Sequence, residues 1–472
     1  MFDAPPGARA HDDHRHLPPG SAIAVVGSGI AGLSAAWLLS RRYHVTVFEA
    51  SAALGGHAHT VDVEAGGRAV PVDAGFIVYN ERTYPNLTNL FRHLGVATAP
   101  SDMSFGVSLD GGRLEYAGAR RLAGLFAQRR NLLRPAFWRM LADIVSFHAA
   151  CRLRDAASPD GATLGDLLAE ASYGRTFRDA HLLPMAAAIW SGTFRSVLDM
   201  PAACFLAFCR NHGLLQLGGR PQWRTVAGRS REYVRCLAAG ISGPVYRSAP
   251  VRAIRRGAGG VEVALAPGAR APFERARFDR VVVAAHADAA LRLLADPSDE
   301  ERRLLGAFAF QPNRAILHGD PALMPRRRAC WSSWNYLAGV PAAGAAATGE
   351  ETPVFVTYWL NRLQNLGAAP PLFLSLNAAR RPREETVLAE FVYDHPQFDG
   401  AAIASQAALA RIQGVRDTWF CGAWTGYGFH EDGLVSGMAA AAALGVEAPW
   451  RAPAPAPAAH SLPALVPAPA AG

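Results

Sequence analysis

A glycine-rich turn between two apolar strands constrains the fold of this chain more than any other feature. Residues 22–26, AIAVV, form a short run rich in β-branched side chains, which is typical of a strand buried on both faces. Gly27, Gly29 and Gly32 follow directly, and a helix and a second parallel strand are predicted within residues 33–48. This order predicts the first βαβ unit of a doubly wound α/β domain.

The spacing of the glycines indicates a dinucleotide site. The first permits a tight turn, the second lets backbone approach a pyrophosphate, and the third lets the helix pack on the strand. Glu49 ends the second strand, 22 residues after Gly27, where a carboxylate can accept hydrogen bonds from ribose hydroxyls. The expected contacts are Gly27, Ser28, Gly29, Ile30, Ala31, Gly32, Glu49 and Ala50. The alternative is a purely structural glycine turn.

The length of 472 residues, of which 50% are hydrophobic, predicts more than one globular domain. Residues 1–20 are expected to form a flexible arm, and residues 449–472 a disordered Pro/Ala-rich tail. The N-terminus lacks the apolar region of a signal peptide, and outside the tail no uncharged apolar run could span a membrane. We therefore expect a cytoplasmic protein.

The histidines and cysteines do not predict a metal site. The six cysteines are scattered without a CxxC pair, so reduced thiols in or near the core are expected. His11, His14 and His16 resemble a metal-binding tract, but no second ligand group accompanies them.

The net charge of +8 comes from arginine alone, because the sequence contains no lysine. Nucleic-acid binding is not predicted, since only a clustered patch would favour an anionic partner. Residues 120–139 interleave Arg with Leu, Phe and Trp, as an interfacial helix would, and Pro135 is predicted to begin a new helix there. This segment either contacts the inner face of a membrane peripherally or is a solvated helix face whose apolar residues pack on the core.

Two further stretches fit a long cofactor. Gly55 and Gly56, followed by His57, would let backbone pass close to it. A hairpin is predicted over residues 61–73, and it ends near Gly75 and Phe76, where a ring could lie against backbone.

These motifs together resemble a known superfamily. Three motifs carry the resemblance: GSGIAGL with the downstream Glu49, GGH at residues 55–57, and VDAG at residues 72–75. They are similar to the N-terminal flavin-binding region of flavin amine oxidases, phytoene desaturases and protoporphyrinogen oxidase. The resemblance implies a Rossmann-like FAD-binding domain of α/β class, with an inserted mixed α+β substrate domain. Members usually carry Arg where His57 stands. A second block continues the resemblance, and there the backbone at Val251 is expected to meet adenine.

Residues 419–437 resemble the superfamily's C-terminal flavin motif. A strand, a Gly/aromatic turn, an acidic pair and a helix start would form a second helix N-terminus that favours an anion. We expect this helix to face the flavin pyrimidine edge, where negative charge develops as a flavin accepts a hydride. The expected contacts are Gly422, Trp424, Asp432, Gly433 and Leu434. The alternative is structural, with Asp432 as an N-cap and a first turn that would tolerate proline at Gly433.

The domains are predicted to be discontinuous. Residues 21–110, 220–300 and 395–448 are assigned to the FAD domain, in which strands at 251–254, 261–265 and 278–285 continue the sheet. Residues 111–219 and 301–394 are assigned to the substrate domain. This domain is expected to contain apolar helices at 182–190 and 201–212 and an antiparallel sheet. The sheet should carry the aromatic residues Trp331, Trp334, Tyr336, Tyr358 and Trp359. Both the helices and these aromatic residues are either core or the wall of a substrate pocket.

The resemblance implies an FAD-dependent oxidoreductase that moves a hydride from a C–H bond to flavin N5. The absent lysine excludes the lysine-held water of flavin amine oxidases, so a small apolar substrate, lipid-like or isoprenoid, is expected. Candidate catalytic residues are His57, Tyr427 and His430, and FAD should be non-covalent because Cys421 lies in a strand-like run. The alternatives are an amine oxidase without lysine, and a flavin-free prenyl- and protein-binding module of the GDP-dissociation-inhibitor type.

Overall fold

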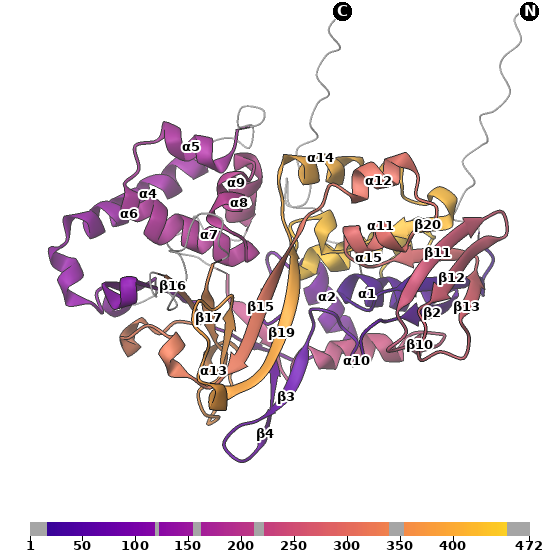
Figure 1. Ribbon diagram of the computed structural model, residues 1–472, viewed down its shortest axis with the longest axis horizontal. Coiled ribbons are helices and arrows are strands. Elements are labelled where there is room, and N and C mark those ends of the chain that lie inside the picture. The colour runs from indigo at the N-terminus through magenta and orange to yellow at the C-terminus, as the bar shows by residue number, and fades with distance from the viewer. Residues whose placement is uncertain (1–16, 119–121, 154–161, 212–220, 339–353, 451–472) are drawn as a thin grey trace, which may run out of the picture.

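The computed structural model describes residues 17–118, 122–153, 162–211, 221–338 and 354–450 (Figure 1). The arm residues 1–16, including His11, His14 and His16, and the tail residues 451–472 lie outside this part of the chain, as does the whole Gly/Ala-rich segment at residues 339–351, for which the composition predicts a flexible loop. Leu17 is buried, and its carbonyl accepts a hydrogen bond from Arg42. The folded domain therefore starts before residue 21, earlier than expected.

A five-stranded parallel sheet forms the centre of the α/β domain. Its strands, in the order β10-β2-β1-β14-β20, are Val245–Tyr246, His44–Phe48, Ala22–Val26, Arg280–Val283 and Thr418–Phe420. All four strand pairs are parallel, which confirms the predicted βαβ unit. The sheet combines three segments far apart in the sequence, as the resemblance implied.

Layers cover both faces of this sheet. On one face lie α1 (Ile30–Leu39) and α15 (His430–Ala443), which pack with Ile23 and Val25 of β1. On the other face, Ala24 and Val26 contact an antiparallel sheet of β11 (Val251–Gly257), β12 (Gly260–Leu265) and β13 (Arg275–Phe278). Helices α11 (Ala287–Leu293), α12 (Asp299–Leu305) and α14 (Gly400–Ala408) complete this layer. Alternate residues of β1 are thus buried on opposite faces.

The separate antiparallel sheet corrects one expectation. Strands β11 and β12 were expected to continue the parallel sheet, but only β14 does so. Residues 258–259 join β11 to β12, and a connection this short forces an antiparallel hairpin.

A seven-stranded mixed sheet forms the second part of the molecule. In the order β19-β15-β18-β17-β16-β7-β8, the strands are Val387–Pro396, Phe310–His318, Phe373–Leu376, Val356–Trp359, Trp334–Ala338, Phe105–Leu109 and Leu114–Gly118. The long strands β19 and β15 form the edge of this sheet that lies nearest the α/β domain (Figure 1). The antiparallel pairing expected for the strands with the aromatic residues is confirmed, because β16, β17 and β18 pair antiparallel. Strand β7, from an earlier part of the chain, adds one parallel pair with β16.

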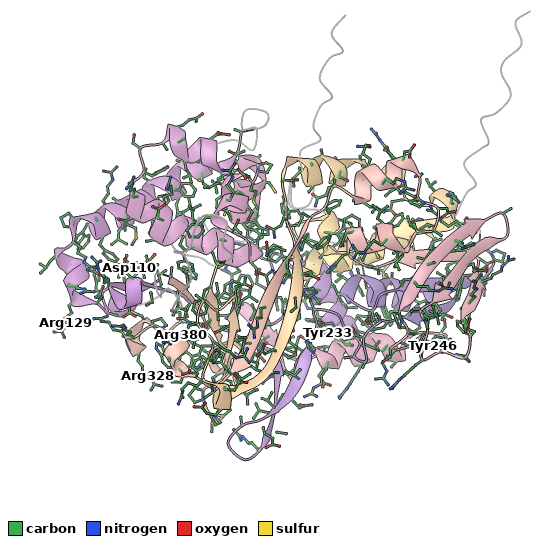
Figure 2. The ribbon with its side chains drawn as sticks, viewed as in Figure 1. Asp110, Arg129, Tyr233, Tyr246, Arg328 and Arg380 are labelled. Carbon is green, nitrogen blue, oxygen red and sulfur yellow. The ribbon has the colours of Figure 1, made fainter. Side chains whose placement is uncertain are left out.

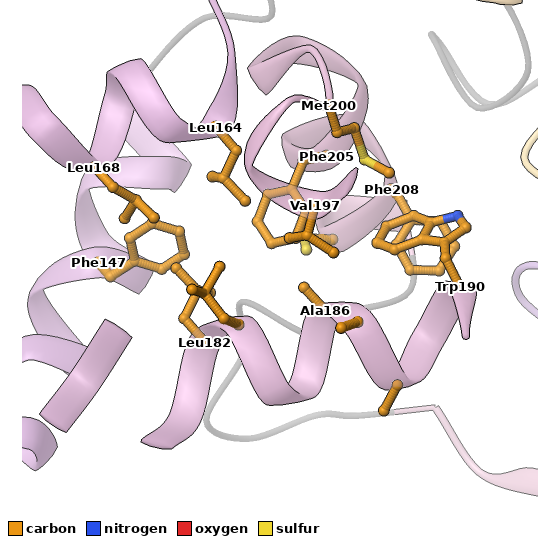
Figure 3. Close-up of a cluster of buried hydrophobic side chains, with 14 of the residues drawn as sticks. Phe147, Leu164, Leu168, Leu182, Ala186, Trp190, Val197, Met200, Phe205 and Phe208 are labelled. Carbon is orange, nitrogen blue, oxygen red and sulfur yellow. The ribbon is translucent and has the colours of Figure 1, made fainter. Parts of the chain in front are cut away.

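A helical lobe covers one end of the mixed sheet. It contains α3 (Leu122–Leu125), α4 (Pro135–Leu153), α5 (Leu164–Glu170), α6 (Arg175–Phe177), α7 (Leu183–Trp190), α8 (Phe194–Leu198) and α9 (Ala202–Asn211), with a π-helical turn, Arg178–Leu182, before α7. Pro135 begins α4, as predicted. Figure 3 shows the core of the lobe, where Phe147, Leu182, Trp190 and Phe205 converge.

Shorter elements join these parts. The hairpin predicted at residues 61–73 is present as β3 (Thr60–Glu64) and β4 (Ala69–Asp73). The others are β5 (Tyr79–Asn80), β6 (Thr98–Pro100), β9 (Trp223–Val226), α2 (Pro85–Leu94), α10 (Arg231–Ala239) and α13 (Leu360–Leu363). Among the described helices, none is long and apolar enough to cross a membrane.

Candidate functional site

Two helix N-termini converge at the carboxyl edge of the parallel sheet. Helix α1 follows β1 and helix α15 follows β20, and the two helices pack side by side (Figure 1). Their close approach needs glycine: a Cβ at Gly433 would lie 2.8 Å from Ile30 Cγ2, and one at Gly437 only 2.2 Å from the Ala31 carbonyl oxygen. The positive ends of two helix dipoles therefore meet at one edge, where an anion is favoured.

The glycine turn leaves room at its middle position alone. A Cβ at Gly27, whose φ is +103°, would lie 2.3 Å from the Ala284 carbonyl oxygen, and one at Gly32 would lie 2.0 Å from the Gly27 carbonyl oxygen. Gly29 has no atom within 4 Å of such a Cβ. The N-terminus of α1 is buried at Ile30, has no side-chain cap and carries no acidic residue in its first turn. These uncapped N–H groups beside an open position fit a pyrophosphate.

Glu49 is buried at the end of β2 and is tied to the turn. Its Oε2 accepts hydrogen bonds from the Ser28 amide (2.9 Å) and hydroxyl (2.6 Å), and its Oε1 accepts one from the Ser51 amide (2.7 Å). The carboxylate thus holds the turn against β2. Its binding of ribose hydroxyls stays a prediction, for which Oε1 retains acceptor capacity.

The other predicted cofactor-binding stretches lie against the turn. The Gly55 amide donates to the Ser28 carbonyl (3.0 Å), and a Cβ at Gly75 would lie 2.1 Å from the His57 carbonyl oxygen. The Phe76 amide also donates to the His57 carbonyl (2.6 Å). These contacts bring the first three motifs together, and their binding of a cofactor stays a prediction.

The segment before Val251 lies beside the end of β2. The Ala249 amide donates to the Glu49 carbonyl (2.8 Å), and the Ser248 amide donates to the Ser51 carbonyl (2.9 Å). Val251 is therefore near the expected adenosine end.

Half-buried rings surround His57. The ring centroids of Tyr393, His395 and His286 lie 5.3, 5.5 and 6.2 Å from that of His57. His57 Nε2 is buried and has no hydrogen-bond partner within the described structure. A buried nitrogen of this kind is rare unless a bound group satisfies it. We call His57, His286, Tyr393 and His395 the His57 cluster.

The His57 cluster is uncharged at neutral pH. Burial, followed by the neighbouring histidines, lowers the pKa of His57 to about 3. Burial lowers the pKa of His395 to about 4 and also lowers that of His286. The position where relatives usually carry Arg therefore holds a neutral imidazole, with no cation to pair with a phosphate or carboxylate.

The start of α15 differs from the expected start. The helix begins at His430, so Asp432 is its third residue and accepts a hydrogen bond from the Phe429 amide (2.9 Å) rather than being the N-cap. Gly433 lies beyond the free first turn, because its amide donates to the Phe429 carbonyl (3.1 Å). The expectation that proline is tolerated at Gly433 is therefore wrong.

The acidic pair, Glu431 and Asp432, accepts hydrogen bonds from backbone amides within the protein. Glu431 accepts hydrogen bonds from the Asn86 and Leu87 amides (2.8 and 2.9 Å), which lie in the first turn of α2. Burial raises the pKa of Glu431 and that of Asp432 to about 7. Glu431 therefore caps α2, and what α15 presents toward a ligand is its backbone.

Trp424 belongs to the core of the α/β domain. Its indole N–H donates to the Ala285 carbonyl (3.0 Å), and its ring packs edge-on against Phe308 with centroids 4.7 Å apart. A Cβ at Gly422 would lie 2.4 Å from the indole nitrogen, so Gly422 makes room for this side chain. Buried Leu434 packs in the core beside α1 and α2. A cofactor contact by Trp424 could come only from its backbone.

The two aromatic catalytic candidates lie on different sides of the α15 N-terminus. His430 stacks on Phe76 with centroids 3.9 Å apart, and its Nε2 lies 2.6 Å from the Tyr233 hydroxyl. Burial lowers the pKa of His430 to about 3, so it is neutral. Tyr427 faces the helical lobe, and burial raises its pKa, so its hydroxyl stays protonated.

An aromatic wall connects this end of α15 to the helical lobe. Phe208 lies between Trp190, Phe429 and Tyr427, with centroids 4.6, 5.0 and 6.1 Å away. The Trp190 indole nitrogen is buried without a hydrogen-bond partner in the described structure. The predicted apolar helices are thus core that extends to the candidate site, and their role as a pocket wall stays a prediction.

Sequence reasoning missed three members of the His57 cluster. His286 follows the end of β14 after two alanines, where a polar residue near the carboxyl end of a parallel strand could have been noticed. Tyr393 and His395 share one face of β19, but their spacing of two does not by itself distinguish them from ordinary strand residues.

Comparisons with known proteins agree with this geometry. The sequence pattern of the family described as flavin containing amine oxidoreductase matches residues 30–318, which is more than half of the chain. A curated relative, carotenoid phi-ring synthase from Chlorobaculum tepidum, is 40% identical over 75 residues. That match covers 16% of this chain and 11% of the relative.

Solved structures share the fold over nearly the whole chain. Cyclohexylamine oxidase from Brevibacterium oxydans IH-35A is 17% identical, with a TM-score of 0.64, and the match covers 90% of this chain and 99% of that one. The CLA-producing fatty acid isomerase from P. acnes is 15% identical, with a TM-score of 0.59, and the match covers 88% and 97%. At these identities the likeness establishes the fold alone.

Proposed function

Because this chain belongs to the family of flavin-containing amine oxidoreductases, we propose that it is an FAD-dependent oxidoreductase that removes a hydride from a C–H bond of an apolar, lipid-like substrate. The observation that carries the proposal is the meeting of two helix N-termini at one sheet edge, next to the open position at Gly29 and the aromatic wall. Family membership also argues against the flavin-free binding module.

Different residues of the chain would bind different parts of FAD. The α1 N-terminus would take the pyrophosphate, Glu49 the ribose, and the backbone near Val251 the adenine. The ring would lie by Phe76 and the α15 N-terminus, where N–H groups stabilise negative charge. Bound FAD would supply the hydride acceptor, with dioxygen or another oxidant restoring it. Non-covalent binding is part of the proposal.

An apolar substrate fits the surroundings of the site. The aromatic wall supplies rings, and the histidines near it are neutral. Both carboxylates of the acidic pair are occupied by backbone amides, so neither is free to bind an ammonium group. Two similar proteins, the carotenoid phi-ring synthase and the fatty acid isomerase, are named for apolar compounds, which is consistent with this substrate class.

An amine substrate is the second candidate, because the family and the similar cyclohexylamine oxidase carry that chemistry in their names. A lysine-held water cannot take part, since the chain has no lysine. Mixing the purified protein anaerobically with amines, fatty acyl lipids or polyenes distinguishes the two. Bleaching of the flavin absorbance by lipids or polyenes supports the proposal, whereas bleaching by amines alone replaces it with the second candidate.

A pair of glycine variants tests whether the turn binds a dinucleotide or is merely structural. Gly29→Ala should leave the melting temperature of the flavin-free protein unchanged, because the added methyl group meets no atom within 4 Å, yet it should abolish FAD binding. Gly32→Ala should lower that melting temperature, because its Cβ would overlap the Gly27 carbonyl. Normal FAD affinity in Gly29→Ala would contradict a pyrophosphate at this turn.

A further inference from the structure

We propose that one exposed surface of the helical lobe docks on a membrane containing anionic phospholipids. The surface, here called the basic apolar patch, combines the apolar side chains of Leu132, Leu133 and Trp138 with the guanidinium groups of Arg113, Arg129 and Arg326. The docking itself does not depend on the proposed enzymatic function, because it requires neither flavin nor turnover.

The apolar half of the patch is unusually exposed. Leu132, Leu133 and Trp138 are 47%, 86% and 48% exposed and lie on a 3-10 turn, Arg129–Leu133, and the start of α4. The Trp138 indole N–H donates to the Leu132 carbonyl (2.9 Å), which holds the two leucines outward on a fixed turn. Neighbouring large apolar side chains presented to water in this way mark an interaction surface.

The basic half of the patch comes from three chain segments. A cavity is lined by Gly111, Gly112, Arg113, Arg130, Arg326 and Arg327. Arg130 and Arg134 donate to the carbonyls of Gly112 (3.2 Å) and Arg113 (2.9 Å) respectively, which fixes the turn carrying the leucines beside the cavity. Sequence reasoning about residues 120–139 alone could not find this cavity, since Arg326 is nearly two hundred residues away.

The patch has a large excess of positive charge. Residues 110–139 contain seven arginines but only two acidic residues, Asp110 and Glu115. Glu115 is buried and forms an ion pair with Arg327, in which Glu115 Oε2 lies 2.7 Å from the guanidinium group. Within the described residues, Arg113, Arg129 and Arg326 form no ion pair. Exposed cations without counterions, next to insertable leucines, complement a surface of lipid phosphates.

The patch lies at one end of the molecule. Figure 2 shows Asp110, Arg129 and Arg328 together at that end, far from Tyr246 in the α/β domain. A flat membrane could therefore contact the patch without meeting the flavin domain. Phe126 and Phe137, beneath the patch, belong to the same apolar cluster as Tyr427. A role of the patch in passing an apolar substrate from the bilayer to the candidate functional site would depend on the proposed function.

Vesicle binding of the full chain tests the proposal. The protein is sedimented with vesicles of phosphatidylcholine alone or mixed with phosphatidylglycerol, at low and high salt. We expect binding to the mixed vesicles only, and weaker binding at high salt because salt screens exposed charges. The triple variant Arg113→Gln/Arg129→Gln/Arg326→Gln should bind about a hundredfold more weakly. The variant Leu132→Ser/Leu133→Ser should lose about tenfold or more.

Matched controls remove the same chemistry elsewhere. Arg41→Gln/Arg68→Gln/Arg270→Gln lowers the net charge equally at exposed positions outside the patch, and Val392→Ser removes an apolar side chain that is 66% exposed on β19. Both controls should bind like the wild type. Unchanged melting temperatures confirm that each variant is folded, which its exposed positions predict.

Three outcomes would overturn the proposal. They are no binding of the wild type to mixed vesicles, equal loss in the patch and control variants, and arginine-dependent binding to double-stranded DNA without vesicle binding. The last result would assign the arginines to nucleic acid. Because all these measurements are made without substrate, failure of the proposed enzymatic function would leave them unchanged.

Discussion

At the scale of single residues, Glu49 has two roles that a substitution can separate. Glu49→Gln should weaken FAD binding by about 1.5–3 kcal/mol, because a hydrogen bond to a charged acceptor is lost at the ribose. Titrating the flavin-free protein with FAD measures the change. Ser28→Ala is the control, since it removes the 2.6 Å bond between Ser28 and Glu49 and a longer 3.3 Å bond from the Gly55 amide, which keeps its bond to the Ser28 carbonyl. If both variants lose the same affinity, Glu49 acts through the turn and not through the ribose.

Cys421 should not attach the flavin covalently. Its thiol is buried, and burial raises its pKa to about 12, so it stays protonated and is a poor nucleophile. Acid denaturation of the yellow protein should release the whole chromophore into the supernatant. Colour that remains with the precipitated polypeptide would show a covalent bond and refute this expectation.

Some residue roles followed from the sequence and others could not. Gly27 and Gly32 were predictable because strand, turn and helix are consecutive, so local spacing determines which Cβ atoms would clash. The His57 cluster was not predictable beyond His57, because its members come from three distant segments that only the folded chain brings together. The sequence shows the acidic pair of residues 431–432 but not that Glu431 caps α2.

At the scale of elements, the register of α15 decides how a proline substitution acts. Gly433→Pro would remove the 3.1 Å hydrogen bond to the Phe429 carbonyl and push ring atoms toward Ile30. Proline inside a helix costs about 3 kcal/mol or more, so the variant should unfold at a much lower temperature. Gly400→Pro, at the first position of α14, is the control and should melt nearly like the wild type. A wild-type melting curve for Gly433→Pro would mean that α15 begins later than residue 430.

Sequence reasoning predicted elements better than their pairing. The strands at 22–26 and 45–48, the hairpin within 61–73 and the helix beginning at Pro135 were predicted from local periodicity and turn chemistry. The parallel pairing of β7 with β16 was missed because more than two hundred residues separate these strands, and periodicity carries no information about distant partners.

At the scale of the whole molecule, buried titrating groups act in opposite directions. Burial lowers the pKa of His57 and His430 to about 3 and that of His318 and His395 to about 4, from 6.5. As pH falls below 6.5, these histidines therefore bind protons in the unfolded chain but not in the folded chain, so the free energy of unfolding decreases. Burial raises the pKa of Asp73 to about 6 and those of Glu431 and Asp432 to about 7, from 3.8–4.5. Between pH 4.5 and 6.5 the folded chain keeps protons that the unfolded chain has released, so these carboxyls favour folding more at lower pH.

The two groups oppose each other between pH 4.5 and 6.5, but the histidines outnumber the carboxyls, because burial also lowers the pKa of His59 and that of His286. The free energy of unfolding of the flavin-free protein should therefore rise with pH across this range, by at least roughly 1.4 kcal/mol per pH unit, as measured by urea denaturation. Asp432→Asn removes one opposing carboxyl while its amide oxygen can still accept from Phe429, so the slope should increase by roughly 1.4 kcal/mol per pH unit. His57→Leu removes one histidine whose Nε2 lacks a partner, so the slope should decrease by roughly 1.4 kcal/mol per pH unit. Equal slopes in all three proteins would mean that neither residue changes its proton binding on folding, and that the balance of buried charge lies elsewhere in the chain.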